Sequence, residues 1–167
     1  MREINFRGMR TDTGDKAEWI CGSLIDYNDT GAPYRRCIRE RSEGCICPVA
    51  PETVGQFTGL CDRNGVEIYE GDVIAYCGEQ FLTAMVCCGE YNENGGNCAK
   101  SDSYGWYFDA IQCQKDTCYN IRQPLRCIDG KAAYFPKYCG ITVEGVENLI
   151  VEVIGNIHEN KDLLTKK

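Results

Sequence analysis

The sequence has few of the residues on which most catalytic and metal sites depend. It holds one histidine, His158, and none of its thirteen cysteines forms a Cys-x-x-Cys pair. A structural zinc site usually draws on such pairs, because two thiolates of one tight turn reach the same tetrahedral ion. A cysteine nucleophile needs a nearby base to become a thiolate, and the neighbours of His158 favour a structural role. We therefore expect no metal site, no cofactor and no catalytic group, so the chain is not expected to be an enzyme.

Long apolar runs are also absent. The segment Met1 to Arg7 is charged, and the longest nearly apolar run, Phe81 to Cys88, is far shorter than a membrane span. These features predict a soluble, cytoplasmic protein. Its cysteines, which are odd in number, are then expected to stay reduced and to act as small hydrophobic residues.

A helical period is missing as well, since no window of a dozen residues carries a sustained apolar stripe. Short β-prone runs separated by turn residues take its place. We expect a mainly β fold, a small barrel or sandwich of short antiparallel strands, in a single domain over residues 1–167. A short C-terminal helix from Lys161, capped by Asn160, is expected to follow.

Several runs are predicted strands. Ile4–Phe6 and Trp19–Ile25 are expected to pair as a hairpin, and Leu149–Ile154 is the strongest strand pattern. Lys115–Tyr138 has no clean period, so both a short helix and an extended excursion stay open there. Further strands are expected at Tyr34–Arg39, Phe81–Cys88 and Trp106–Phe108.

Turn residues are densest between Gln56 and Tyr76. The pair Asn64-Gly65 lies between β-prone runs and predicts a hairpin with a type I′ turn, in which both central residues have positive φ. Asp62 and Asp72 are expected to bond turn amides. The nearby carboxylates could cage a divalent cation, but such sites normally recruit more oxygens from a dedicated loop; they are Glu67, Glu70 and Asp72.

Charge is uneven along the chain. Residues 45–112 hold two Lys or Arg against ten Asp or Glu, and the net charge of −7 repels phosphate backbones. The candidates for nucleic-acid contact are Arg35, Arg36, Arg39, Arg41 and Tyr34. On a strand, Arg36 would point away from the other three arginines. The alternative that we favour is a solvated edge strand protected from aggregation by its charges.

Four blocks in this order resemble the YopX-like proteins of bacteriophages and prophages: Met1–Gly8, Gly55–Leu60, Asp62–Ile74 and Glu152–Asn160. The resemblance implies a mainly β fold, a cytoplasmic phage or prophage origin and no assigned activity. The sequence departs from the family pattern in an insert-like region around residues 77–148. The signature turn residues, for which we expect structural roles, are Gly59, Asp62, Asn64, Gly65, Gly71, Asp72 and Gly155.

Two functional classes follow. The favoured one is a non-enzymatic phage accessory module that binds a protein partner, or a second copy of itself, through a sheet edge or loop. The alternative is a nucleic-acid-associated phage protein that uses the Arg35–Arg41 patch. A weaker third idea is an acidic mimic of nucleic acid that occupies a basic groove of a host enzyme.

Overall fold

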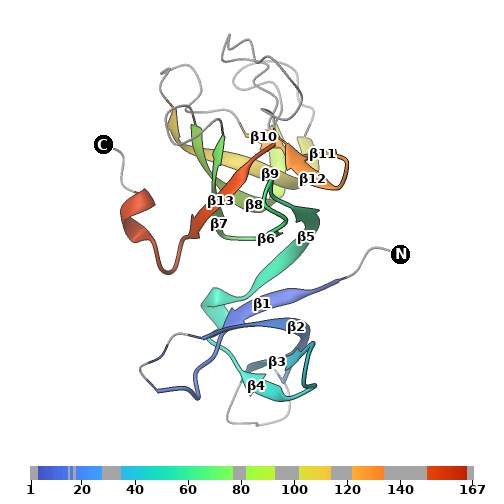
Figure 1. The fold of residues 1–167 in the computed structure, drawn as a ribbon, viewed down its shortest axis with the longest axis vertical. Helices are drawn as coiled ribbons and strands as arrows, with labels where there is room; N and C mark the ends of the chain where they lie inside the picture. Colours follow the sequence, from blue (N-terminus) through green and yellow to red (C-terminus); the bar gives the residue numbers. More distant parts are fainter. Residues whose placement is uncertain are drawn as a thin grey trace. The chain divides into compact units, whose positions relative to one another are not determined.

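The structure, a computed structural model, describes residues 4–14, 16, 18–27, 35–76, 82–92, 102–113, 122–133 and 150–164. The mainly β prediction is confirmed, because the described strands form two sheets, of eight and five strands (Figure 1). The chain divides into two compact units, Met1–Gly59 and Leu60–Lys167. This division does not test whether residues 1–167 fold as a single domain, so that expectation stays a prediction.

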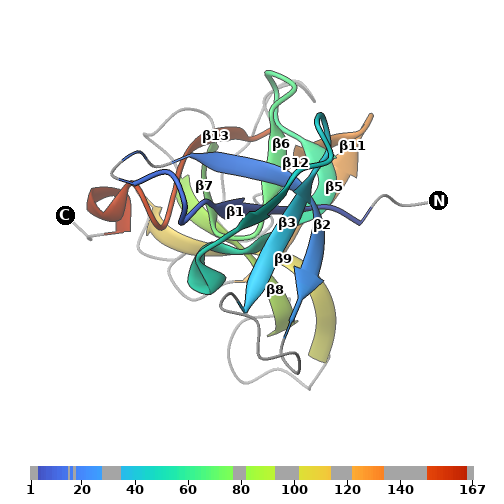
Figure 2. The ribbon, with the colours of Figure 1, turned by 90° about the horizontal axis from the view of Figure 1, so that it is seen from below.

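The first unit is built from one antiparallel series of strands (Figure 2). The predicted hairpin is confirmed, since Met9 pairs with Trp19 and Phe6 with Gly22. In the order β5-β1-β2-β3-β4, the strands are β5 (Gly55–Cys61), β1 (Phe6–Met9), β2 (Trp19–Asp26), β3 (Arg36–Glu40) and β4 (Ile46–Pro48). A single 3-10 turn, η1 (Pro51–Thr53), leads from β4 to β5.

The first unit curls around a small core. A bridge between Arg10 and Val49 brings the ends of β1 and β4 together. Any side chain at Gly22 would collide with the backbone carbonyl of Arg39, so β2 and β3 pack closely at this glycine. The core consists of Ile20, Ile38, Cys47 and Val49, with Phe6, Leu24 and Val54 packed against them.

The second unit contains the last residues of β5 and the remaining strands. Five of them form an antiparallel sheet in the order β10-β9-β8-β7-β13. They are β10 (Gln123–Pro124), β9 (Asp102–Cys113), β8 (Leu82–Asn92), β7 (Asp72–Tyr76) and β13 (Glu152–Asn156). The end of β5 pairs with β6 (Glu67–Tyr69) and β12 (Lys131–Ala133), and β12 pairs with β11 (Arg126–Ile128).

The core of the second unit lies between these two groups of strands. Ile74, Val86 and Phe108 of the five-stranded sheet pack in one buried cluster with Ile68 of β6 and Ala132 of β12. Side chains with at most 1% exposure make up this cluster, so it is a dry apolar interior. Among the described strands the layers stay open, and no closed barrel is seen.

The predicted C-terminal helix is wrong. At this position the structure has one turn of 3-10 helix, η4 (Lys161–Leu164). The side-chain oxygen of Asn160 accepts a hydrogen bond from the backbone N–H of Asn156 (3.1 Å) instead of capping the turn that follows it. The backbone N–H of Leu163 donates to the carbonyl of Asn160 (3.0 Å), which is the tighter 3-10 spacing.

The strands on either side of Asn64-Gly65, β5 and β6, pair as predicted, but the predicted type I′ turn between them is wrong. Gly65 has a φ of +85°, but Asp129 is the only non-glycine residue of the described ranges with positive φ. Asp62 accepts hydrogen bonds within the turn and holds the residue before Gly65 at negative φ. The type I′ pattern occurs instead at Asp129-Gly130, with φ of 49° and 78°, where it joins β11 to β12. The described part of Lys115–Tyr138, residues 122–133, therefore holds strand β10 and the β11–β12 hairpin, and no helix.

Candidate functional site

The signature residue Asp62 is a structural hub of the second unit. Its side chain is fully buried. One carboxylate oxygen accepts the backbone N–H groups of Asn64 (2.7 Å) and Val66 (2.9 Å), and the other accepts that of Val153 (3.1 Å). A carboxylate buried with this many donors fixes backbone strongly, because charge-assisted hydrogen bonds are short and strong. Asp62 thus ties its own turn to β13.

The other signature residues also act on backbone. Asp72 is buried and accepts the N–H of Tyr69 (2.8 Å). Gly59 and Gly71 have φ of 85° and 82°, a region that glycine occupies without steric strain. A side chain at Gly155 would collide with the amide of Asn160. These contacts fit the structural roles that the sequence predicts for the signature.

The carboxylates near Asp72 are engaged by the protein itself. Glu67 accepts the hydroxyl hydrogen of Tyr69 (2.6 Å), and Asp72 accepts a turn amide as described above. Within the described ranges, no group of three or more His, Cys, Asp or Glu side chains is placed to hold a metal ion.

The candidate arginines do not share one face. Arg36 lies in β3, its Nε 3.5 Å from a carboxylate oxygen of Asp26, and it also donates to the carbonyl of Pro51 (3.3 Å). Arg39 is exposed and, by strand alternation, points to the opposite face from Arg36. β3 ends at Glu40, so Arg41 lies in the following turn.

Two of these arginines line one open hollow. Arg35 precedes β3 and is exposed, and together with Arg36, Pro51 and Glu52 it borders a volume of about 320 Å³. Arg41 points its guanidinium at the amide oxygen of Asn5, in the amide orientation that satisfies both groups. Tyr34 lies outside the described residues.

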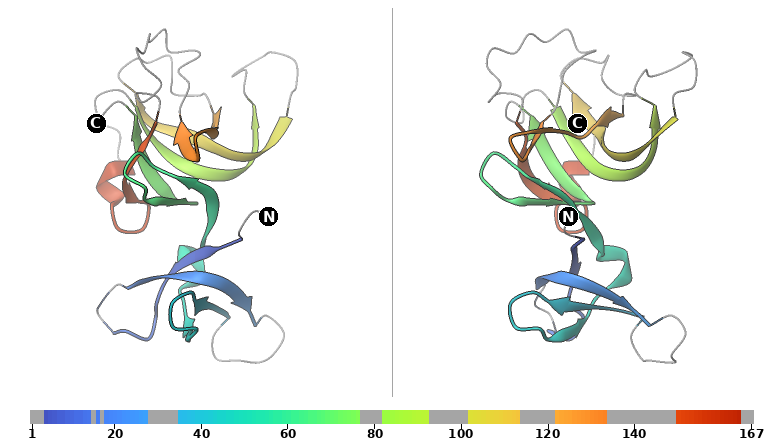
Figure 3. Two further views of the ribbon diagram at one scale, coloured as in Figure 1. Left: turned by 45° about the vertical axis from the view of Figure 1, so that its right-hand side comes forward. Right: turned by 90° about the vertical axis from the view of Figure 1, so that its right-hand side faces the viewer.

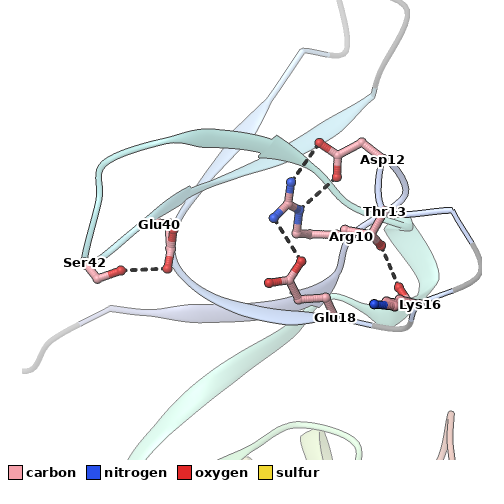
Figure 4. A network of polar contacts seen from close by, with 7 residues as sticks. All are labelled: Arg10, Asp12, Thr13, Lys16, Glu18, Glu40 and Ser42. Carbon is pink, nitrogen blue, oxygen red and sulfur yellow. Dashed lines mark hydrogen bonds and ion pairs between the residues drawn. The ribbon is translucent and has the colours of Figure 1, made fainter.

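An ion-pair network holds the turn between β1 and β2 (Figure 4). Arg10 donates to both carboxylate oxygens of Asp12 (2.8 and 3.1 Å) and to Glu18 (2.9 Å). The Arg10 guanidinium lowers the pKa of the Asp12 carboxyl. The hydroxyl of Thr13 donates to the carbonyl of Lys16 (2.6 Å) in the same turn. Because two carboxylates surround Arg10, this cation is a poor receptor for an anionic ligand.

A two-stranded ribbon extends from the second unit's sheet (Figure 3). β8 and β9 pair from Leu82 with Cys113 to Asn92 with Asp102. β7 pairs only with Leu82–Met85 of β8, and β10 pairs only with Tyr107 and Phe108 of β9. Beyond these pairings, the described residues Cys88–Asn92 and Asp102–Trp106 continue as a two-stranded stretch, which we call the ribbon. At its inner end, the backbone N–H of Leu125 donates to the carbonyl of Trp106 (2.9 Å).

One face of the ribbon is braced by Arg122. Its guanidinium carbon lies 5.2 Å from the centroid of the Tyr107 ring, and its Nε lies 3.4 Å from a carboxylate oxygen of Asp109. It also donates to the backbone carbonyl of Glu90 (3.3 Å). The rings of Tyr91 and Tyr107 are 5.5 Å apart. These contacts hold the ribbon to the rest of the sheet.

The other face of the ribbon continues the core outward. Along β9, Phe108 is 1% exposed, Trp106 is partly buried against the core cluster, and Tyr104 is 78% exposed. Tyr104 is the most exposed of the large hydrophobic side chains in the described ranges. The sequence marks Trp106–Phe108 as a strand but does not single out Tyr104; the alternation Tyr104, Trp106, Phe108 was the available signal.

The comparison with protein families confirms the family resemblance that the sequence blocks carry. The family model described as YopX protein matches residues 5–165. The chain belongs to the YopX family. No curated protein matches it.

The YopX match extends over both compact units and includes every signature turn residue. The ribbon lies within the region around residues 77–148 in which the sequence departs from the family blocks. In the described part of this YopX-family chain, no helix is long and apolar enough to cross a membrane.

Proposed function

We propose that this YopX-family protein is a non-enzymatic interaction module that binds a protein partner through its ribbon. The observation that carries the proposal is Tyr104, a residue that is 78% exposed at the outer end of an apolar line that begins in the core. Tyrosine is enriched among the residues that dominate binding energy, because it offers a large rigid surface with little conformational entropy to lose. The contacts of Arg122 hold the ribbon in one conformation before the partner binds, and such preorganisation favours affinity for the partner.

Three of the described cysteines support a role without covalent chemistry at their positions. Burial raises the pKa of Cys37 and Cys47, and it raises the pKa of Cys87 to about 11. A thiol with a raised pKa is protonated at neutral pH, whereas a nucleophilic cysteine needs a lowered one. We infer an accessory protein of phage or prophage origin that works in the bacterial cytoplasm, where thiols stay reduced.

Affinity purification from bacteria that carry the gene tests the proposal. We expect a protein to be recovered with the tagged wild-type chain and to be lost with Tyr104→Ala, because truncation of a central aromatic contact weakens binding about tenfold or more. Val66→Ala is the matched control, since Val66 is a large hydrophobic residue exposed at 49% elsewhere in the second unit. The purified partner is then titrated against all three chains.

Retention of every bound protein by Tyr104→Ala, with an unchanged unfolding midpoint, would contradict binding through the ribbon. A sedimentation experiment on the same chains shows whether the partner is a second copy, because self-association would then depend on Tyr104.

A second candidate function is contact with nucleic acid. The hollow bordered by Arg35 and Arg36 favours it, although Glu52 lies beside the hollow and Asp26 beside Arg36. If it is correct, affinity for single-stranded DNA falls steeply with added salt, and replacing Arg35, Arg36, Arg39 and Arg41 by Gln flattens the slope. Absence of binding at low salt rejects it.

A further inference from the structure

We propose that Tyr104 and Glu90 together bind a basic side chain, an arginine or lysine of an exposed segment of the partner protein. This inference rests on the proposed function, because it names the chemistry by which the ribbon recognises its partner. It concerns one pair of residues on the face of the ribbon opposite Arg122.

The register of the ribbon places the two side chains together. Glu90 and Tyr104 are directly paired across β8 and β9, so they point to the same face with Cβ atoms about 5 Å apart. Both side chains are exposed. The backbone carbonyl of Glu90 accepts a hydrogen bond from Arg122 (3.3 Å), which fixes the strand at this position. In the described ranges, the Glu90 carboxylate has no ion pair of its own.

This combination suits a cation on an aliphatic stem. The face of a tyrosine ring attracts a guanidinium or ammonium group, and a neighbouring carboxylate accepts its N–H groups. The next pair inward, Cys88 with Trp106, is partly buried and apolar. It can receive the methylene groups of an arginine or lysine stem while the charged end lies at Glu90 and Tyr104.

The net charge of the second unit favours a basic partner. The second unit, Leu60–Lys167, holds ten Lys or Arg against sixteen Asp or Glu. This excess of negative charge speeds the approach of a basic segment and repels a second acidic copy of the chain. We therefore assign the surface to a basic segment of a different protein.

An NMR titration of the full chain tests the assignment. The probes are acetyl-(Gly-Arg)3-amide, the same peptide with Gln in place of Arg, and spermidine. We expect the arginine peptide to shift the backbone amides of residues 88–91 and 103–106, and the glutamine peptide to leave them unchanged. No shift in these segments, equal shifts with both peptides, or tighter binding of spermidine than of the arginine peptide would overturn the proposal.

Four variants separate the contributions of charge and ring. Glu90→Gln and Tyr104→Leu are each expected to weaken arginine-peptide binding roughly two- to fivefold, as for an exposed ion pair and an exposed cation–π contact. Tyr104→Phe keeps the aromatic face and is expected to bind like the wild type. Glu43→Gln removes the same charge from an exposed position in the first unit and serves as the control. Equal weakening by Glu43→Gln and Glu90→Gln would overturn the proposal.

Two outcomes separate the contact with a basic side chain from the binding of a partner protein. A purified partner that is lost with Tyr104→Ala but binds Glu90→Gln like the wild type contradicts the basic contact and leaves the interaction module intact. A chain that binds the arginine peptide at the ribbon but recovers no protein from cells supports the basic contact and contradicts the proposed function.

Discussion

At the scale of single residues, Asp62 has the largest structural role of the signature. It is fully buried, and both of its oxygens accept backbone N–H groups, one of them from a residue 91 positions away. Replacement by asparagine keeps the size but turns one acceptor into a donor that faces an N–H group. The amides that lose their acceptor stay away from water, so the change costs folding free energy.

We predict that Asp62→Asn lowers the free energy of unfolding by about 2–3 kcal/mol, as expected for a buried charged acceptor. Urea denaturation followed by tryptophan fluorescence measures it. Asp129→Asn is the matched control, because Asp129 lies at positive φ in a hairpin turn, where asparagine fits well. Equal stabilities of the Asp62→Asn chain and the control would show that Asp62 is not the hub that its contacts indicate.

Cys87 is a second residue whose surroundings give a measurable consequence. Burial, followed by the negative charge of Asp109, raises its pKa to about 11 from an ordinary 9.0. The folded state thus favours the neutral thiol. The contribution of the neutral Cys87 thiol to the free energy of unfolding is fully present below pH 9. It is lost as the pH rises through 11, because the thiol of the unfolded chain releases its proton at lower pH than the thiol of the folded chain.

We predict that iodoacetamide modifies Cys87 in the native protein about 100-fold more slowly at pH 8 than a thiol of ordinary pKa, because thiolate is the reactive form. The rate is expected to rise steadily towards pH 11. Mass spectrometry of peptides after timed alkylation measures it, with the exposed Cys45 of the same chain for comparison. Equal rates for the two cysteines at pH 8 would contradict the raised pKa.

At the scale of elements, the ribbon is joined to the segment around β10 by Arg122, the residue before that strand. Arg122 contacts the Tyr107 ring, Asp109 and the carbonyl of Glu90. Each contact is partly exposed, so their sum is small compared with the stability of a whole domain. Their loss affects the opening of the ribbon more than global unfolding.

We predict that Arg122→Gln speeds amide hydrogen exchange several-fold in residues 88–92 and 102–106, while the free energy of global unfolding changes by less than about 1 kcal/mol. Exchange followed by NMR at single residues measures both. Arg39→Gln, an exposed change in the first unit, is the control. Unchanged exchange in the ribbon would show that strand pairing alone holds it.

The elements also show how far sequence patterns extend. Period-two alternation and turn residues predict the β1–β2 hairpin and the β class, because both depend on local geometry. The type of the Asn64-Gly65 turn is wrong because the Asp62 side chain takes the turn amides, a competition that the dipeptide alone does not reveal. The sequence pattern does not predict the Asp129-Gly130 hairpin, because its flanking strands are only three residues long and show no clear alternation.

At the scale of the whole molecule, the sequence identifies the family but not the surface that we propose for binding. The signature blocks are local patterns, and the family match over residues 5–165 confirms the resemblance. The Tyr104–Glu90 pair depends on the register of β8 with β9, which depends on tertiary packing. The predicted arginine patch is a sequence cluster that β3 distributes over two faces.

The two units differ in net charge. Met1–Gly59 holds eight Lys or Arg against nine Asp or Glu and is nearly neutral, whereas Leu60–Lys167 carries most of the net negative charge. The ribbon belongs to the acidic unit. Attraction of a basic partner at long range therefore originates in the same unit as the proposed contact.

The hydrogen bond between Asp62 and Val153 constrains the order in which the chain acquires its structure during synthesis. Residues 91 positions apart must meet before the second unit is complete, and β13 also supplies an edge of its five-stranded sheet. A ribosome must therefore have passed β13 before this unit closes, whereas all residues of the first unit have emerged long before. Translation that stops before β13 leaves β7 paired with β8 on one side only, and its other side is then an unpaired strand edge that is prone to aggregation.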